Sequence, residues 1–245
     1  MVTSFKQYFF ENFYNDTLHP RFWDEQKQFD PEVREKLLQI AKDVSESVEV
    51  TDLIDDIQLT GSLANYNYTD YSDLDVHILL DYAKINEDED LVKAALDGKR
   101  FIWNLRHDIK IGGYEVEIYF QDVHEPHMAS GLYSLLEGKW LREPAFNPPE
   151  VDKADVMTKA DQIKRDIDML ESKVDSASDQ SEIEDLQAMA SKIRKKISKM
   201  RKDSLEKDGE FGVGNLAFKE LRNSEYIGKV IDIDNQLYDK LFISD

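Results

Sequence analysis

The chain has 245 residues, of which 41% are hydrophobic and 33% are charged, and its formal net charge is −20. A chain of this length can bury the core of one large domain or two modest ones, but its mean field repels nucleic acid and anionic membranes unless basic residues gather locally. Cysteine is absent, which excludes disulfides, thiolate zinc sites and a thiol nucleophile.

The amino-terminal stretch MVTSFKQYFFENF is aromatic but is interrupted by Lys6, Gln7 and Glu11. It lacks the apolar core of an export signal. Nowhere does the chain approach the roughly 18 consecutive apolar residues that a membrane helix needs. We therefore expect no export, no membrane partner and a cytoplasmic location.

Residues 31–80 predict one helix and two strands. Asp30 and Pro31 form a helix start, and the apolar residues that follow repeat at helical spacing to Val44, so a helix is expected over roughly 31–47. The segment DDIQLTGS, residues 55–62, predicts a short strand that enters a tight turn. The segment LDVHILL, residues 74–80, predicts a second central strand.

The next segments predict a helix and two hairpins. Residues 87–106 have helical character, and Gly112-Gly113 lies between two alternating runs, which is a strong hairpin signal. A second hairpin is expected around Glu137-Gly138. The segment REPAFNPPEV, residues 142–151, holds three prolines, so we place a domain boundary between residues 150 and 151.

Beyond this boundary the apolar residues recur at steps of three and four. They form two stripes, Val156, Ala160, Ile163, Ile167, Leu170 and Val174, followed by Ile183, Leu186, Ala190, Ile193, Ile197 and Met200. Such stripes predict two coiled-coil-like helices, joined by the polar loop DSASDQ into an antiparallel hairpin. Ser181 and Glu184 indicate a capping box at the start of the second of these helices. The segment GEFGVGN ends the hairpin, and two further helical patterns run to Phe242.

The predicted fold class is therefore α+β. Residues 1–150 should form a small mixed β-sheet domain with helices. Residues 151–245 should form a helical bundle that contains the antiparallel hairpin.

Two aspartates lie one residue apart within the second predicted strand region. Asp73 and Asp75 point to one face because side chains alternate along a strand, whereas Leu74 and Val76 point into the core. Two like charges sharing one site are costly unless a cation lies between them. Carboxylate oxygens suit Mg²⁺, which keeps waters and substrate phosphates as its other ligands.

A third carboxylate is expected from a neighbouring strand. Glu117 lies between Val116 and Ile118 in the run YEVEIYF, and Glu115 lies on the same face and is its rival. Three carboxylates on two strands can hold two Mg²⁺ ions, or Mn²⁺, for in-line displacement at phosphorus.

Ten residues separate the turn Gly61-Ser62 from Asp73. Glycine permits close backbone approach, and exposed amides with a hydroxyl can hold phosphate oxygens. The order Gly-Ser, Asp-apolar-Asp and a later apolar-Glu-apolar strand resembles the signature of the DNA polymerase beta-like nucleotidyltransferase superfamily. The whole chain also resembles stand-alone nucleotidyltransferase-fold proteins of tailed bacteriophages. If the chain is phage-encoded, its expected location is the host cytoplasm.

This resemblance implies a catalytic domain over residues 1–150 that moves a nucleoside monophosphate from a nucleoside triphosphate, ATP by default, to a hydroxyl-type acceptor with release of pyrophosphate. By the same resemblance Ser62 contacts the triphosphate, Asp73 and Asp75 bind both metal ions, and Glu117 binds the catalytic one and helps deprotonate the acceptor. The acceptor is open: RNA, a protein, a small molecule or another nucleotide. The alternative is a catalytically silent nucleotide-binding or antitoxin-like module on the same fold.

Several further side chains have two interpretations each. Four residues follow the turn closely: Asn65, Tyr66, Asn67 and Tyr68. They either contact the nucleotide or the acceptor, or they pack within the domain. We assign Asn65 to the cofactor-binding set, together with Gly61 and Ser62. His77 is interpreted as a hydrogen-bonded strand histidine. His124 and His127, in the segment HEPH, are interpreted as incidental rather than metal ligands.

The segment Lys192–Lys202 carries seven basic residues and no acid. It could bind a polyphosphate or a nucleic-acid acceptor despite the acidity of the chain. The favoured interpretation is that it pairs with the acids of the preceding helix, which are Asp161, Asp166, Asp168 and Glu171.

Overall fold

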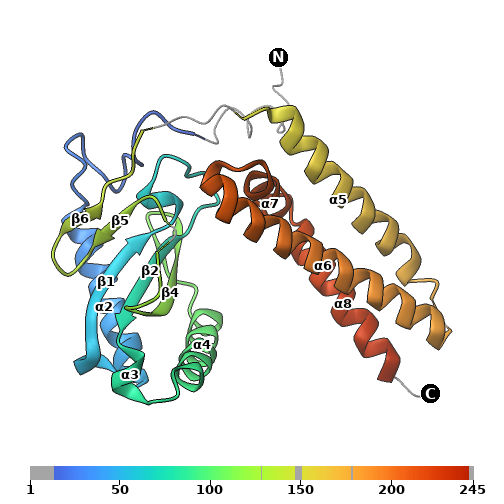
Figure 1. Ribbon diagram of the computed structural model, residues 1–245, viewed down its shortest axis with the longest axis horizontal. Helices are drawn as coiled ribbons and strands as arrows, with labels where there is room; N and C mark the ends of the chain where they lie inside the picture. The colour runs from blue at the N-terminus through green and yellow to red at the C-terminus, as the bar shows by residue number, and fades with distance from the viewer. Residues whose placement is uncertain (1–13, 128, 147–150, 178, 243–245) are drawn as a thin grey trace. The chain divides into compact units, whose positions relative to one another are not determined.

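The computed structural model describes residues 14–127, 129–146, 151–177 and 179–242. The chain divides into two compact units, residues 1–148 and 149–245. The first is built on a β-sheet and the second is made of helices (Figure 1). The protein is thus of the α+β class, as the sequence predicts. The amino-terminal stretch used above to predict the absence of an export signal lies outside the described residues.

The first unit contains a six-stranded mixed sheet. Its elements are α2 (Pro31–Ser47), η1 (Thr51–Leu53), β1 (Ile54–Thr60), η2 (Ser62–Ala64), β2 (Leu74–Leu80), α3 (Tyr82–Ile85), α4 (Glu89–Arg106), β3 (Lys110–Ile111), β4 (Tyr114–Asp122), β5 (Leu132–Ser134) and β6 (Lys139–Arg142). The strand order is β3-β4-β2-β1-β5-β6. Strands β2 and β4 are parallel, and the other neighbouring pairs are antiparallel.

The predicted first helix is confirmed as α2. The Asp30 side chain accepts hydrogen bonds from the backbone N–H groups of Glu32 and Val33, and Pro31 occupies the first turn, where its missing N–H costs nothing. Leu37 and Val44 are buried. The helix therefore begins at the predicted cap and packs through its apolar face.

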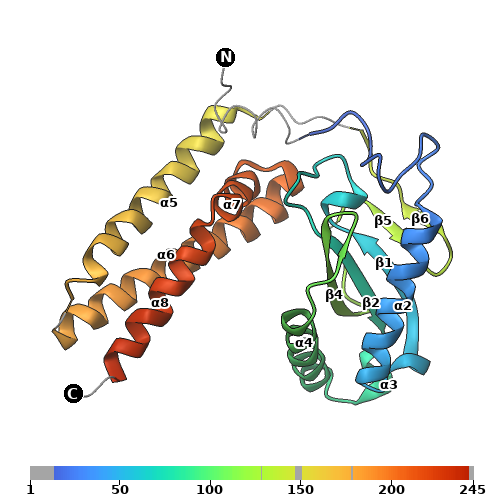
Figure 2. The same cartoon turned by 180° about the vertical axis from the view of Figure 1, so that it is seen from behind.

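One face of the sheet carries most of the core of this unit. Val76 of β2 and Ile118 of β4 are paired in register and are both completely buried, as is Leu37 of α2. Helices α2 and α4 pack against β2 and β4 respectively (Figure 2). The Asn104 side chain of α4 also pairs with the backbone N–H and C=O of Ile118. The side chains between the core residues therefore project from the other face.

The two predicted hairpins are present. Strands β3 and β4 pair antiparallel around Gly112-Gly113, although β3 is only two residues long. Strands β5 and β6 pair antiparallel across the turn that holds Glu137 and Gly138. Both hairpins extend the sheet at its edges, so β1, β2 and β4 form its centre.

The second unit contains α5 (Lys153–Val174), α6 (Gln180–Asp208), η3 (Gly209–Phe211), α7 (Val213–Asn223) and α8 (Tyr226–Phe242). Every residue of the stripe predicted for α5 is buried. In α6 the predicted stripe is buried from Ile183 to Ile197, whereas Met200 is half-buried and Ser204 is buried. The periodicity in the sequence therefore marks the faces that pack.

The predicted capping box at the start of α6 is wrong. The N-cap is Asp179, whose side chain accepts from the Glu182 N–H at 3.4 Å. Ser181 lies inside the helix, and Glu184 accepts from the Gln180 side chain at 3.1 Å. Aspartate caps a helix as well as serine does, and the earlier position of Asp179 lets the helix begin before Ser181.

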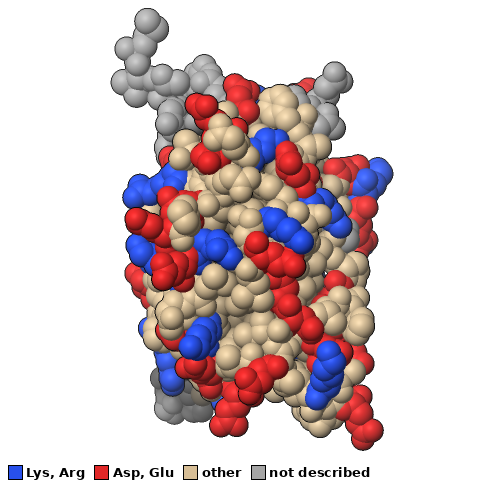
Figure 3. Space-filling model, turned by 90° about the vertical axis from the view of Figure 1, so that its left-hand side faces the viewer, with Lys and Arg blue, Asp and Glu red and all other residues tan. Residues whose placement is uncertain are grey.

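The charged surface is mixed in sign. On the face drawn in Figure 3, Lys and Arg side chains lie among Asp and Glu side chains. Within the described part of the chain, no helix combines the length and the apolar character that crossing a membrane requires.

Candidate functional site

Asp75 and Glu117 occupy paired positions of the parallel strands β2 and β4. Their neighbours Val76 and Ile118 point into the core, so both acids project from the opposite face, where each is half-buried. Thr60 pairs with Asp75 from the other side, in β1. The register thus places the two predicted carboxylates next to each other in the middle of the sheet.

Gly61 lies directly against the Asp75 carboxylate. Its φ of 75° and ψ of −161° fall in a region that is open essentially to glycine alone. A Cβ at this position would lie 1.9 Å from Asp75 Oδ2. The turn after β1 therefore requires glycine twice over, for its backbone conformation and for the room that it leaves to the acid.

The turn that follows Gly61 is tied to the loop before β2 by two serines. The Ser62 and Ser72 hydroxyls are hydrogen-bonded at 2.7 Å, and Ser72 Oγ accepts from the Thr69 N–H at 2.9 Å. Asp73 follows Ser72, is half-buried and lies two residues before Asp75. Sequence reasoning missed Ser72, although its place next to Asp73 was a signal that could have found it.

Tyr119 connects Glu117 to the rest of this face and was also missed. Its hydroxyl donates a hydrogen bond to Glu117 Oε2. The His77 ring stacks on it with centroids 4.9 Å apart, and the Arg100 guanidinium of α4 lies 4.6 Å from the centroid of its ring.

The electrostatic environment keeps Tyr119 in the role of a donor. Burial, then the nearby Asp75 carboxylate and then the hydrogen bond to Glu117 raise the pKa of Tyr119 far above its ordinary value. The phenol therefore stays protonated. Its position two residues after Glu117 on the same strand was the available sequence signal.

The two candidate third acids occupy different environments. The Glu115 side chain is 54% exposed and forms an ion pair with Lys110 at 3.1 Å. Glu117 is half-buried, pairs in register with Asp75 and is held by Tyr119. The geometry therefore favours Glu117 as the partner of Asp75.

Within the described residues, no group of three or more His, Asp or Glu side chains is arranged so that it could hold a metal ion. The predicted three-carboxylate set of Asp73, Asp75 and Glu117 thus stays a prediction. Asp75 and Glu117 as a pair do fit Mg²⁺ in their chemistry, because this ion is commonly held by one or two carboxylates while substrate phosphates and waters complete its shell.

His77 is a hydrogen-bonded strand residue, as predicted. Its Nδ1 is hydrogen-bonded to Gln121 Oε1 at 2.7 Å. Burial is the main cause that lowers the pKa of His77 to about 4, so the ring is neutral at physiological pH. His127 lies with its ring 5.8 Å from His77, and its pKa is lowered by burial too. The side chain of His124 is 72% exposed.

The segment after the Gly-Ser turn packs inside the unit. Asn65 is only 1% exposed; its Nδ2 donates to Ser130 Oγ at 2.6 Å, and its Oδ1 accepts from the Tyr66 N–H at 2.8 Å. The Tyr66 ring packs against Phe146 at 5.3 Å, and the Tyr68 ring against His19 at 4.7 Å. Residues 65, 66 and 68 thus have partners within the unit, and the assignment of Asn65 to nucleotide binding stays a prediction.

The basic segment of α6 forms an ion pair with α5. Lys196 contacts Asp166 at 3.1 Å. The α5 acids Asp168 and Glu171 are instead bound by Lys229 of α8, at 2.8 and 2.7 Å. The expectation that the preceding helix neutralises the segment is therefore only partly correct, because α8 also packs against both helices.

The site geometry stands without support from known relatives. No protein-family model matches the chain, and searches of curated proteins and of solved structures give no match either. The resemblance to the nucleotidyltransferase superfamily therefore rests on the order of the motifs and on the arrangement described above.

Proposed function

We propose that the protein is a Mg²⁺-dependent nucleotidyltransferase, with its catalytic site in residues 1–150, on the face of the sheet that carries Asp75 and Glu117. The observation that carries the proposal is the side-by-side placement of Asp75 and Glu117 on parallel strands, with Gly61 against Asp75. These residues come in the order of the superfamily signature.

The proposed reaction is a displacement at the α-phosphorus of a nucleoside triphosphate, with ATP as the default donor. The oxygen of an acceptor hydroxyl forms a new bond to the α-phosphorus, and the bond from that phosphorus to the bridging oxygen breaks. Pyrophosphate leaves with the bonding electron pair, and the hydroxyl proton passes to a base.

In this proposal Glu117 takes that proton, and Tyr119 holds the Glu117 carboxylate in place. Bound Mg²⁺ would supply charge neutralisation for the phosphates and would be held by Asp75 and Glu117, with Asp73 as the third predicted ligand. Ser62, at the start of the turn after Gly61, would hold a phosphate oxygen with its hydroxyl.

In the helical unit, we propose that α5 and α6 form an antiparallel hairpin, as their apolar stripes and the polar loop between them predict. A cytoplasmic location, in a bacteriophage host if the chain is phage-encoded, fits an enzyme that uses a nucleoside triphosphate.

The test is to incubate the protein with Mg²⁺ and each labelled nucleoside triphosphate, with RNA, protein and small-molecule acceptors, and to measure release of pyrophosphate. Asp75→Asn and Glu117→Gln should each lower the rate by a factor on the order of 100 or more. Glu115→Gln, which changes an exposed acid of the same strand, should retain most of it. Asp55→Asn, in β1, is a second control because Asp55 is exposed.

Two results would overturn the proposal. One is transfer that survives Asp75→Asn. The other is silence with every nucleotide and acceptor, together with Mg²⁺ binding that Asp75→Asn leaves unchanged, and this result would favour the catalytically silent module.

A further inference from the structure

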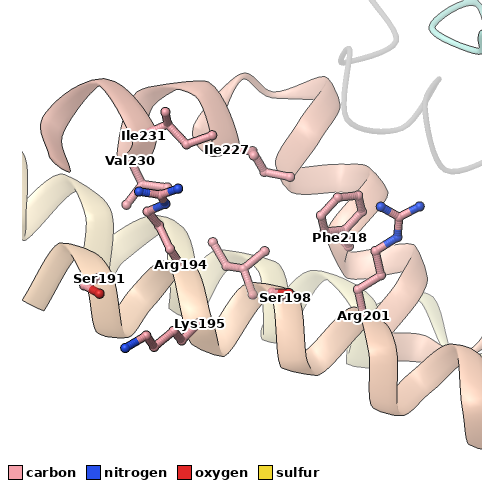
Figure 4. A pocket seen from close by; sticks show the side chains of 10 residues that line it. Ser191, Arg194, Lys195, Ser198, Arg201, Phe218, Ile227, Val230 and Ile231 are labelled. Atoms are coloured by element: carbon pink, nitrogen blue, oxygen red, sulfur yellow. The ribbon is translucent and has the colours of Figure 1, made fainter. Parts of the chain in front are cut away.

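The helical unit contains a pocket of about 480 Å³ between α6, α7 and α8 (Figure 4). Its apolar lining comes from all three helices and includes Ile197, Phe218, Ile227 and Val230. Phe218 and Ile227 are half-buried, so an apolar surface remains open to a ligand. The volume is in the range of pockets that enclose small organic groups, which is roughly 300–1,000 Å³.

The cations of this pocket all come from the basic segment of α6. They are Arg194, Lys195 and Arg201, and within the described residues no Asp or Glu is part of the lining. Arg194 and Arg201 are two helical turns apart, which is about 10 Å along the axis. Figure 4 shows Arg201 beside Phe218 at one end and Arg194 near Val230 toward the other.

Two of these cations are held in defined positions. Arg194 forms an ion pair with Asp234 of α8. The Arg201 guanidinium lies over the Phe218 ring, 4.3 Å from its centroid. A guanidinium supported in this way presents a flat cationic surface, on which a nucleic-acid base can stack.

Three other basic residues of the segment form ion pairs away from the pocket. Lys196 pairs with Asp166, and Lys199 pairs with Asp203 at 3.0 Å. Lys202 lies 3.9 Å from Glu206. These lysines therefore provide a matched set of cations, on the same helix, that do not line the pocket.

We propose that this pocket binds single-stranded nucleic acid, with phosphates at Lys195 and Arg201 and a base on the Arg201–Phe218 platform. The combination of cations with an open apolar lining matches a single strand, whose bases are unstacked and available, better than a duplex. The excess of acidic residues elsewhere favours a short, local contact, because the rest of the surface repels a polyanion. That the strand is the acceptor of the transferred nucleotide rests on the proposed function, whereas the binding itself does not.

The experiment measures fluorescence anisotropy of a labelled single-stranded RNA, the same sequence as DNA, and a duplex, between about 50 and 200 mM salt. Lys195→Gln/Arg201→Gln should weaken binding of the single strands roughly tenfold and lower the slope of log K against log salt by about 1.4, since each phosphate contact contributes about 0.7. Lys199→Gln/Lys202→Gln, which removes the same charge, should leave both values near those of the wild type.

Phe218→Leu separates stacking from charge. It should weaken binding about fivefold or more while the salt slope stays unchanged, because it removes an aromatic surface but no cation. The folded state of each variant is checked by its melting temperature. If Phe218→Leu does not fold, Phe218→Tyr, which keeps the aromatic ring, should bind as the wild type does.

Several outcomes would overturn the inference. They are absence of binding to single strands, equal losses in the two double variants, and equally tight binding of the duplex, of inorganic polyphosphate or of an acidic peptide. If neither the wild type nor any variant transfers a nucleotide but the strand still binds through the pocket, the proposed function fails and this inference stands.

Discussion

Asp75 and Glu117 lie side by side on neighbouring parallel strands, and the backbone of Gly61 abuts the Asp75 carboxylate. Like charges in directly adjacent strand positions are destabilising. The proposed Mg²⁺ would offset this repulsion. The predictions below follow from this relationship and from the groups that surround it.

Mg²⁺ should stabilise the folded protein through this pair. At a Mg²⁺ concentration ten times its dissociation constant, the free energy of unfolding should rise by about 1.4 kcal/mol, because the ion binds the folded state and not the unfolded chain. Thermal unfolding with and without Mg²⁺, and after chelation by EDTA, measures this gain. The gain should be lost in Asp75→Asn and retained in Asp55→Asn, and an equal gain in both would contradict a site at Asp75.

Gly61→Ala should damage both stability and activity. The new Cβ would lie 1.9 Å from Asp75 Oδ2, at a backbone φ of 75°. The conformational strain alone costs about 1–3 kcal/mol, and the displaced carboxylate should lose its role in transfer. Urea unfolding and the pyrophosphate assay measure the two effects.

Gly98→Ala is the matched control for that variant. Gly98 lies within α4, and a Cβ there would meet no atom within 4 Å. In a helix interior, alanine is more favourable than glycine by about 0.5–1 kcal/mol. Gly98→Ala should therefore be slightly more stable than the wild type. A Gly61→Ala protein that is as stable as Gly98→Ala would contradict the close approach of Gly61 to Asp75.

Tyr119→Phe should reduce the rate of transfer while it costs about 1 kcal/mol of stability, the usual contribution of one hydrogen bond. The lost hydroxyl holds the Glu117 carboxylate in position, so kcat should fall by a larger factor than KM changes. Values of kcat and KM, measured side by side for the wild type and the variant, test this. Tyr71→Phe, at a residue that is 47% exposed, should leave both values unchanged.

Stability should fall as the pH drops from about 6.5 towards 4, and His77 should account for part of the loss. Burial lowers the pKa of His77 from 6.5 in the unfolded chain to about 4 in the folded protein. Between these values the unfolded chain binds more protons, so acid favours unfolding. The contribution of His77 to the free energy of unfolding should be nearly complete at pH 7.5 and roughly 2 kcal/mol smaller at pH 5.

Unfolding by urea at both pH values, for the wild type and for His77→Gln, isolates this contribution. The variant should lose less stability between pH 7.5 and pH 5 than the wild type does, because Gln does not titrate. His124→Gln serves as the control, since its side chain is 72% exposed. Identical losses in the wild type and in His77→Gln would show that His77 is not buried as a neutral ring.

Local sequence signals account for much of the fold. The alternation in LDVHILL predicts β2 with its observed bounds, and Asp30-Pro31 predicts the start of α2. The apolar stripe of α5 is buried throughout. These features depend on residues close together in the chain, so periodicity and capping chemistry suffice to predict them. The misplaced start of α6 shows the limit of such signals, since Asp179 and Ser181 are both good caps.

The sequence by itself determined which residue types could do chemistry: a Gly-Ser turn, paired aspartates, a later glutamate and a basic stretch. Only the tertiary structure decided that Asp75 pairs with Glu117 while Glu115 pairs with Lys110, and that α6 shares the α5 acids with α8. Strand order and helix packing bring these distant segments together, and they are set by the burial of the whole core rather than by any local pattern. The Tyr119 hydrogen bond and the pocket at Arg201 therefore became visible only in three dimensions.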